Sequence, residues 1–173
     1  HIMKTIIVDP FPREMDLIFK PNKIKLLKKN FKIINAPSKN KLKFYKQHIS
    51  EADFIIGQPD LPKSILTLAS KLKAIFNVES NFMDNMDYDY CFKNNIYVLS
   101  TAPVFAQSVA EIAVGLTISL KRDIHKAHLD FYQKKEKYGL ESNLRSSLLL
   151  GNKIGFIGFG DLARSLKPML MPY

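Results

Sequence analysis

The sequence predicts an α/β fold built on a parallel sheet, and two observations lead to this expectation. Short apolar and β-branched runs alternate with helix-like segments along the first part of the chain, at a spacing of roughly 20–25 residues that is typical of right-handed strand–helix–strand crossovers. The runs are apolar throughout, as expected where helices cover both faces of a sheet. We therefore predict a flavodoxin-like, parallel-sheet domain over residues 3–100 and a second region over residues 101–173.

Each predicted strand is bounded by residues that favour a turn or a loop. Residues 4–8 form the first strand and stop at Asp9-Pro10, and residues 53–57 form the third and stop at Gly57. The other predicted strands are 31–34, 72–78 and 96–99, and the predicted helices between strands are 24–30, 41–50, 64–70 and 88–94.

The pattern then changes to that of a long helix, which we expect to run from Ser108 to about Lys137. Ser108 and Glu111 have capping-box spacing, in which the serine oxygen and the glutamate satisfy free amides of the first turn. The first half of this helix is apolar on nearly every side and is expected to be buried, whereas the second half is polar and is expected to end at Gly139.

Composition favours a soluble protein in a reducing compartment. Of the 173 residues, 46% are hydrophobic and 24% are charged, which suffices for a packed core. The most apolar stretch, 109–120, contains Glu111, so we interpret it as a buried helix and expect no membrane association. The single cysteine excludes an internal disulfide bond and favours a cytoplasmic location.

The net charge of +10 has three interpretations: a solvated lysine surface, attraction of an anionic substrate, or binding of nucleic acid. The lysines occur singly and in pairs, and the sequence contains no arginine-rich stripe and no motif that mixes aromatic and basic residues in the way RNA-binding motifs do. We favour the solvated surface and expect no nucleic-acid partner.

A glycine motif near the end of the chain indicates a dinucleotide site. The predicted strand 153–157 leads into Gly158-x-Gly160 and then a helix in which Ala163 stands at the position of the usual third glycine. Gly158 allows a tight turn, Gly160 allows close approach of a pyrophosphate, and the helix start offers free amides to phosphate. The alternative is a strand–helix turn without a ligand, and the acidic residue that usually binds the ribose would lie beyond Tyr173.

Three sequence blocks together resemble the D-isomer-specific 2-hydroxyacid dehydrogenases. They are the glycine block 149–160, the alanine-proline block 101–111 and the block 77–87, which ends in Asp-Asn-x-Asp. The resemblance implies a flavodoxin-like substrate domain, a long inter-domain helix and the first βα unit of a Rossmann domain that binds NAD or NADP. It also implies reduction of a small 2-keto acid to a D-2-hydroxy acid, and a homodimer formed through the helix that starts near Ser108.

The same resemblance implies two groups of binding residues. The substrate loop carries over to Ser80, Asn81 and Phe82, although Phe82 replaces a small residue and should reshape the pocket unless it points into the core. The catalytic arginine, glutamate and histidine of the family are expected beyond residue 173, so this chain alone should be inactive. The residues matched to cofactor binding are Gly158, Gly160, Asp161, Leu162, Ala163 and Ser108.

Two other functions remain open: a non-catalytic, nucleotide-binding dimeric regulator or scaffold, and a Rossmann-type protein of another class that uses S-adenosylmethionine.

His125 and His128 have a metal-ligand spacing on a helix, but a third ligand is not obvious, so we favour a solvated face. Cys91 is interpreted as a packed core thiol, and Arg145 and Arg164 as surface arginines. We expect the strand 154–157 to pair with another chain or to pack on the long helix of a dimer mate.

Overall fold

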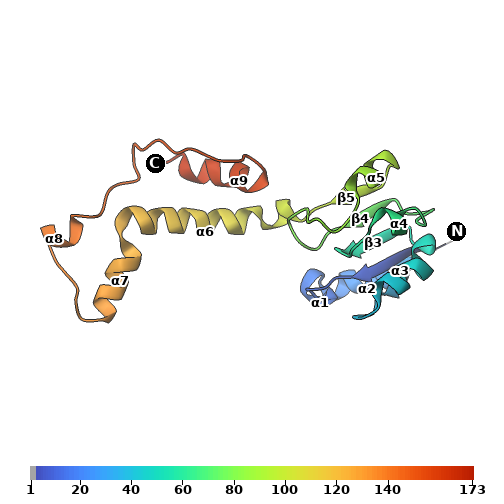
Figure 1. Ribbon diagram of the computed structural model, residues 1–173. Coiled ribbons are helices and arrows are strands. Elements are labelled where there is room, and N and C mark those ends of the chain that lie inside the picture. The colour runs from blue at the N-terminus through green and yellow to red at the C-terminus, as the bar shows by residue number, and fades with distance from the viewer. Residues whose placement is uncertain (1–2) are drawn as a thin grey trace. The chain divides into compact units, whose positions relative to one another are not determined.

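The computed structural model describes residues 3–173, and these residues form two compact units. The first unit ends at Thr101, and the second unit runs from Ala102 to Tyr173. Figure 1 shows the elements of both, and each unit is described by itself.

The first unit contains a five-stranded, fully parallel sheet with the strand order β2-β1-β3-β4-β5. This is the flavodoxin-like order, so the predicted fold class is confirmed. Each of the five strands predicted within residues 3–100 is present, with ends that differ by at most two residues. The strands are β1 (Lys4–Asp9), β2 (Phe31–Asn35), β3 (Phe54–Gly57), β4 (Ala74–Phe76) and β5 (Tyr97–Leu99).

Helices cover both faces of this sheet, because successive strand residues point to opposite faces. Ile7, Ile55 and Ile75 pack in one buried cluster with residues of α3, α4 and α5. Ile6 and Val8 pack in a second cluster with residues of α1 and α2. The helices of this unit are α1 (Met15–Ile18), α2 (Pro21–Asn30), α3 (Lys41–His48), the short 3-10 helix η1 (Ile49–Glu51), α4 (Lys63–Leu66) and α5 (Tyr88–Lys93).

A close backbone contact fixes the carboxyl ends of β1 and β3. Gly57 has a φ of 146°, and a Cβ atom at this position would lie 2.0 Å from the carbonyl oxygen of Asp9. Only glycine therefore fits at the end of β3. The Asp9 side chain is 4% exposed, and it accepts hydrogen bonds from Lys41 Nζ at 2.6 Å and from the Tyr45 hydroxyl at 3.0 Å.

The second unit is helical, and α9 packs along α6 (Figure 1). The expected single helix from Ser108 to about Lys137 is wrong at both ends. The observed helix α6 starts earlier than predicted, at Ala102. Pro103 lies in its first turn, where no backbone hydrogen bond is lost because the amides there have no partner within the helix. The helix breaks at Asp123, whose φ is 55°, and a separate helix follows. The helices are α6 (Ala102–Arg122), α7 (Ile124–Tyr132), α8 (Leu140–Asn143) and α9 (Asp161–Leu170).

The predicted capping box is wrong for the same reason. Ser108 lies in the second turn of α6, and its hydroxyl donates to the carbonyl of Phe105 at 3.0 Å. Glu111 accepts a hydrogen bond from the side chain of Gln107 at 3.1 Å. The capping-box spacing therefore occurs inside a helix, where the amides are already paired along the backbone.

The predicted strand 153–157 does not form, and residues 152–156 have no regular secondary structure. A parallel strand obtains its hydrogen bonds from neighbouring strands. Among residues 3–173, β1 to β5 pair with one another and none pairs with this segment. Phe156 instead packs edge-to-face on Phe159, with ring centroids 5.5 Å apart.

The expectation that the first half of the long helix is buried on nearly every side is also wrong within this chain. In α6 the buried residues are Ala106 and Ala110, whereas Ile112, Leu116 and Leu120 are each at least 60% exposed. By length and composition alone α6 could cross a membrane, since it has 21 residues and its most apolar window has a mean hydropathy of 1.5. Buried helices of soluble proteins pass the same test, so this criterion does not identify what covers α6.

Candidate functional site

The block 77–87 follows β4 and lies at the carboxyl edge of the sheet, which is where ligands bind in open α/β sheets. Polar side chains anchor it from the next strand. Gln58 Nε2, just past β3, donates to the carbonyl of Asn81 at 2.7 Å, and Asn85 Nδ2 donates to the carbonyls of Gln58 and Pro59 at 3.2 and 2.8 Å. The expected substrate residues are thus held on a fixed loop, which we call the substrate loop (residues 77–87).

Ser80, Asn81 and Phe82 lie together on this loop, outside the buried core. Phe82 is 56% exposed, and its ring packs edge-to-face on Tyr88 with centroids 5.6 Å apart. The alternative in which Phe82 points into the core is therefore wrong.

An ion pair that sequence reasoning missed joins the start of the substrate loop to the segment after β1. Arg13 Nε lies 2.9 Å from Glu79 Oε1, and Arg13 Nη2 lies 3.4 Å from Glu79 Oε2. The residues are 66 positions apart, so no local spacing rule could have found them. Glu79 directly precedes Ser80.

Buried polar atoms of one buried and two half-buried side chains lie just past the ends of β3, β4 and β5, where the substrate loop begins. Asn77 is 2% exposed, and neither its Oδ1 nor its Nδ2 has a hydrogen-bond partner among residues 3–173. The same holds for Gln58 Oε1 and for Thr101 Oγ1, which follow β3 and β5. Buried polar atoms are normally paired, so this edge of the sheet keeps hydrogen-bonding capacity for a water molecule or a small polar ligand.

The glycine turn leads directly into α9, as expected. Gly158 has a φ of 83°, a value that favours glycine. Gly160 is the residue before the helix; its φ of −88° suits any residue, and a Cβ atom there would meet nothing within 4 Å. A glycine with positive φ followed by a glycine directly before a helix leaves the first amides of that helix open to close approach by a phosphate group. The residues fit a dinucleotide phosphate on this observation.

The other residues matched to the cofactor surround the same helix start. Asp161 is the first residue of α9, where an acidic side chain suits the helix dipole, and Leu162 and Ala163 follow in the first turn. Ser108 lies on α6 instead, and its neighbour Gln107 places Nε2 3.9 Å from Sδ of Met169, near the carboxyl end of α9. The structure therefore brings the glycine turn and the first turn of α9 together, but not Ser108.

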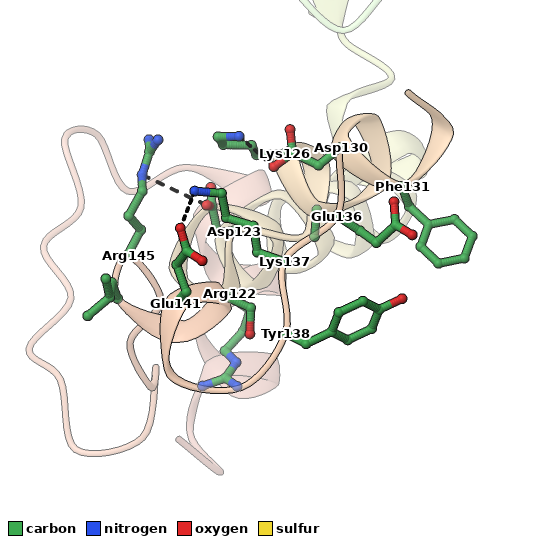
Figure 2. Close-up of a pocket in the computed structure, with 13 residues that line it drawn as sticks. Arg122, Asp123, Lys126, Asp130, Phe131, Glu136, Lys137, Tyr138, Glu141 and Arg145 are labelled. Atoms are coloured by element: carbon green, nitrogen blue, oxygen red, sulfur yellow. Dashed lines mark hydrogen bonds and ion pairs between the residues drawn. The ribbon is translucent and has the colours of Figure 1, made fainter. Parts of the chain in front are cut away.

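A separate cavity of about 390 Å³ in the second unit was not expected from the sequence. Figure 2 shows its charged side chains, which come from α7, α8 and the segments beside them. Lys126 pairs with Asp130 at 2.6 Å, Lys137 pairs with Glu141, and Arg145 lies 3.9 Å from Asp123. Because these charges neutralise one another, the cavity has no electrostatic preference for an anionic ligand.

The remaining candidates behave as surface or core residues. Cys91 is fully buried, and burial raises the pKa of its thiol to about 11, which keeps it protonated at neutral pH. His125 and His128 are exposed, and no metal-binding group of three or more His, Cys, Asp or Glu side chains occurs in the described part of the chain. Arg145 and Arg164 are exposed, as are Lys23, Lys25, Lys28 and Lys29 of α2.

Comparison with known proteins gives a consistent result. The model of the D-isomer-specific 2-hydroxyacid dehydrogenase catalytic domain matches residues 15–157. A hydroxypyruvate reductase of Thermotoga maritima is 27% identical over 139 residues, covering 75% of this chain and 44% of that protein. The chain thus spans less than half the length of this relative.

Two solved structures show the same architecture. A phosphoglycerate oxidoreductase from Rhizobium etli is 37% identical, with a TM-score of 0.82 over 98% of this chain and 53% of that one. A glyoxylate/hydroxypyruvate reductase from Sinorhizobium meliloti, solved with NADP and malonate, is 18% identical, with a TM-score of 0.66 over 98% of this chain and 50% of that one. The latter likeness concerns the fold alone.

The parallel sheet, the loop at its carboxyl edge and the glycine turn before α9 thus occur in a chain most of which matches one family model. The chain belongs to the D-isomer-specific 2-hydroxyacid dehydrogenases, a family of oxidoreductases.

Proposed function

We propose that this chain supplies the substrate-binding domain and the start of the dinucleotide site of an NAD- or NADP-dependent oxidoreductase that reduces a small 2-keto acid to a D-2-hydroxy acid. The observation that carries the proposal is the glycine turn before α9, in which Gly158 has a φ of 83° and Gly160 directly precedes the first residue of a ten-residue helix. The family match and the loop at the carboxyl edge of the sheet support it.

The proposed role of the substrate loop is to hold the carboxylate of the 2-keto acid. Ser80 and Asn81 offer backbone amides and side-chain donors on a loop that Gln58 fixes in place. Phe82 limits the size of the group that fits beside them. In this proposal Ser80, Asn81 and Phe82 bind and orient the substrate from a loop that is already held in position.

The proposed role of the 158–163 turn is to hold the cofactor diphosphate. Free amides at the start of α9 and the positive end of its dipole favour phosphate, and the absence of a Cβ at Gly160 allows close approach. A bound nicotinamide cofactor would supply the hydride. The acid–base residues of the family have no match in this chain, so we propose that the chain alone is inactive.

We further propose that two copies associate through α6. Ile112, Leu116 and Leu120 recur at helical spacing on this helix, and all three are exposed in the single chain. An apolar helix stripe of this kind is stabilised when it is covered by a partner. A symmetric dimer brings the same stripe from both copies together.

The function is tested by titrating the chain with NADH and following nucleotide fluorescence. Gly160→Val should abolish binding, because its side chain would occupy the space proposed for the phosphate; since Gly160 is also the N-cap of α9, the loss of stability should stay at about 1 kcal/mol or less, which thermal unfolding verifies. Gly155→Val is the matched control: this residue lies before the turn and also meets nothing within 4 Å, so the variant should bind as the wild type does. Equal binding by Gly160→Val and wild type would refute the assignment of the phosphate site.

A further inference from the structure

The geometry points to Arg13 as a positioning residue for substrate binding. We propose that Arg13 neutralises the carboxylate of Glu79 and holds it at the base of the substrate loop, so that the adjoining residues can accept an anionic 2-keto acid. This inference rests on the proposed function, and it adds a residue from the segment after β1 to the substrate-binding machinery.

The contact has the form of a two-point recognition of a carboxylate by a guanidinium. Two nitrogen atoms of Arg13 face the two oxygen atoms of Glu79, at 2.9 and 3.4 Å. The Arg13 and Glu79 side chains are 37% and 32% exposed, so the pair lies at the rim of the fold. A fork of this geometry fixes both the position and the orientation of the carboxylate, which a lysine would not do.

Arg13 itself projects from a short, well-defined turn. Its backbone amide donates to the carbonyl of Pro10 at 2.8 Å, directly after β1. The neighbouring Phe11 ring lies beneath Lys41 Nζ, which is 5.5 Å from the ring centroid. Because Lys41 also binds the buried Asp9, this turn is tied to the sheet and presents Arg13 from a fixed base.

Glu79 has little freedom to move away from the loop. Its carbonyl accepts a hydrogen bond from the amide of Thr101 at 3.5 Å, and two residues later Asn81 is held by Gln58. The backbone from which the Glu79 carboxylate projects is therefore held next to Ser80 and Asn81, and the contacts of the carboxylate itself are those with Arg13. Without Arg13, Glu79 would add an unpaired negative charge next to the residues proposed to hold the substrate carboxylate, and like charges repel.

This arrangement predicts a charge-specific rescue. We would titrate the chain with pyruvate and with glyoxylate, and follow the backbone amide signals of Ser80 and Asn81 by NMR. Arg13→Gln should weaken binding by about tenfold, because Glu79 is left unneutralised. Glu79→Gln alone should bind at least as well as the wild type. The double variant should return to within about twofold of the wild type, because the repulsive charge is gone.

A purely structural role predicts a different pattern. If the ion pair only stiffened the loop, Arg13→Gln and Glu79→Gln would weaken binding equally, and the double variant would show no recovery. Hydrogen exchange of the amides of residues 79–82, measured without ligand, shows whether a variant has loosened the loop or has only changed its charge. Thermal unfolding verifies that each variant folds.

The outcomes separate this inference from the proposed function. If wild-type chain shows no response at Ser80 and Asn81 to either keto acid, the substrate-loop assignment fails, and the role of Arg13 fails with it. If the wild type responds and Arg13→Gln binds equally well, the proposed function stands and the role of Arg13 is overturned. Rescue in the double variant supports both.

Discussion

Single residues at the carboxyl ends of the strands set the geometry of the candidate site. Asp9 ends β1 as a buried carboxylate, and it is paired with Lys41 and Tyr45, which come from α3. The sequence places Asp9 at a strand end, but its partners lie 32 and 36 residues away. Contacts of this range depend on how a helix packs on the sheet, and no residue spacing encodes them.

The Tyr45–Asp9 contact predicts a loss of stability in alkali. Burial first, and then the charge of Asp9 and their hydrogen bond, raise the pKa of Tyr45 far above its ordinary value of 10.0. The folded state therefore binds this proton more tightly than the unfolded state. The stabilisation of the folded state by protonated Tyr45 is complete below pH 10. It is lost as the pH rises above 10, at about 1.4 kcal/mol per pH unit.

Tyr45→Phe tests this, because it removes the ionisable group and keeps the ring. Urea unfolding between pH 9 and pH 11 should show a weaker loss of stability for the variant than for the wild type. Cys91 and Tyr88 also have raised pKa values and are present in both proteins, so the difference between the two proteins isolates Tyr45. Parallel curves for both proteins would contradict the buried Tyr45–Asp9 contact.

At the scale of elements, strands were predicted more accurately than helices of the second unit. A strand buried on both faces has a short apolar run with clear ends, as β1 and β3 show. Helix boundaries depend on which of several start signals is used. In α6, Pro103 lies in the first turn, and the capping-box spacing of Ser108 and Glu111, which begins five residues later, lies inside the helix.

The revised start of α6 makes a direct prediction. Ser108→Ala should change the free energy of unfolding by less than about 0.5 kcal/mol, since its hydroxyl only bonds within the helix. Asp87→Ala is the comparison, because the Asp87 carboxylate caps α5 by accepting from the amide of Tyr90 at 2.9 Å. Loss of that cap should cost about 1 kcal/mol. Chemical unfolding measures the free energy of unfolding of both variants. An equal loss for Ser108→Ala and Asp87→Ala would indicate that Ser108 caps a helix after all.

At the scale of the whole molecule, the second unit exposes apolar surface that a folded chain normally covers. Its long helix α6 buries only two alanines in the described chain, and the segment before the glycine turn lacks neighbouring strands. The apolar composition of α6 was visible in the sequence. The sequence does not show which surface covers α6, and we propose that this surface is α6 of a second copy of the chain.

The proposed dimer predicts that Leu116→Lys dissociates it, because the substitution places a charge in an apolar interface. Sedimentation velocity at micromolar concentration should show a dimer for the wild type and a monomer for the variant. Leu129→Lys is the matched control, since Leu129 is similarly exposed on α7 and outside the proposed interface. A wild type that sediments as a monomer at these concentrations would rule out this interface.

The sequence by itself determined the parallel sheet, its five strands and the glycine turn before α9, because each depends on residues that are close together along the chain. It also located the substrate loop through a block of matching residues. Only the tertiary structure decided which side chains fix that loop, since Arg13 meets Glu79 and Gln58 meets Asn81 across strand ends that are distant in sequence. Whether residues 153–157 form a strand likewise depends on tertiary structure, because a parallel strand needs a neighbour to supply its hydrogen bonds and residues 3–173 supply none to this segment.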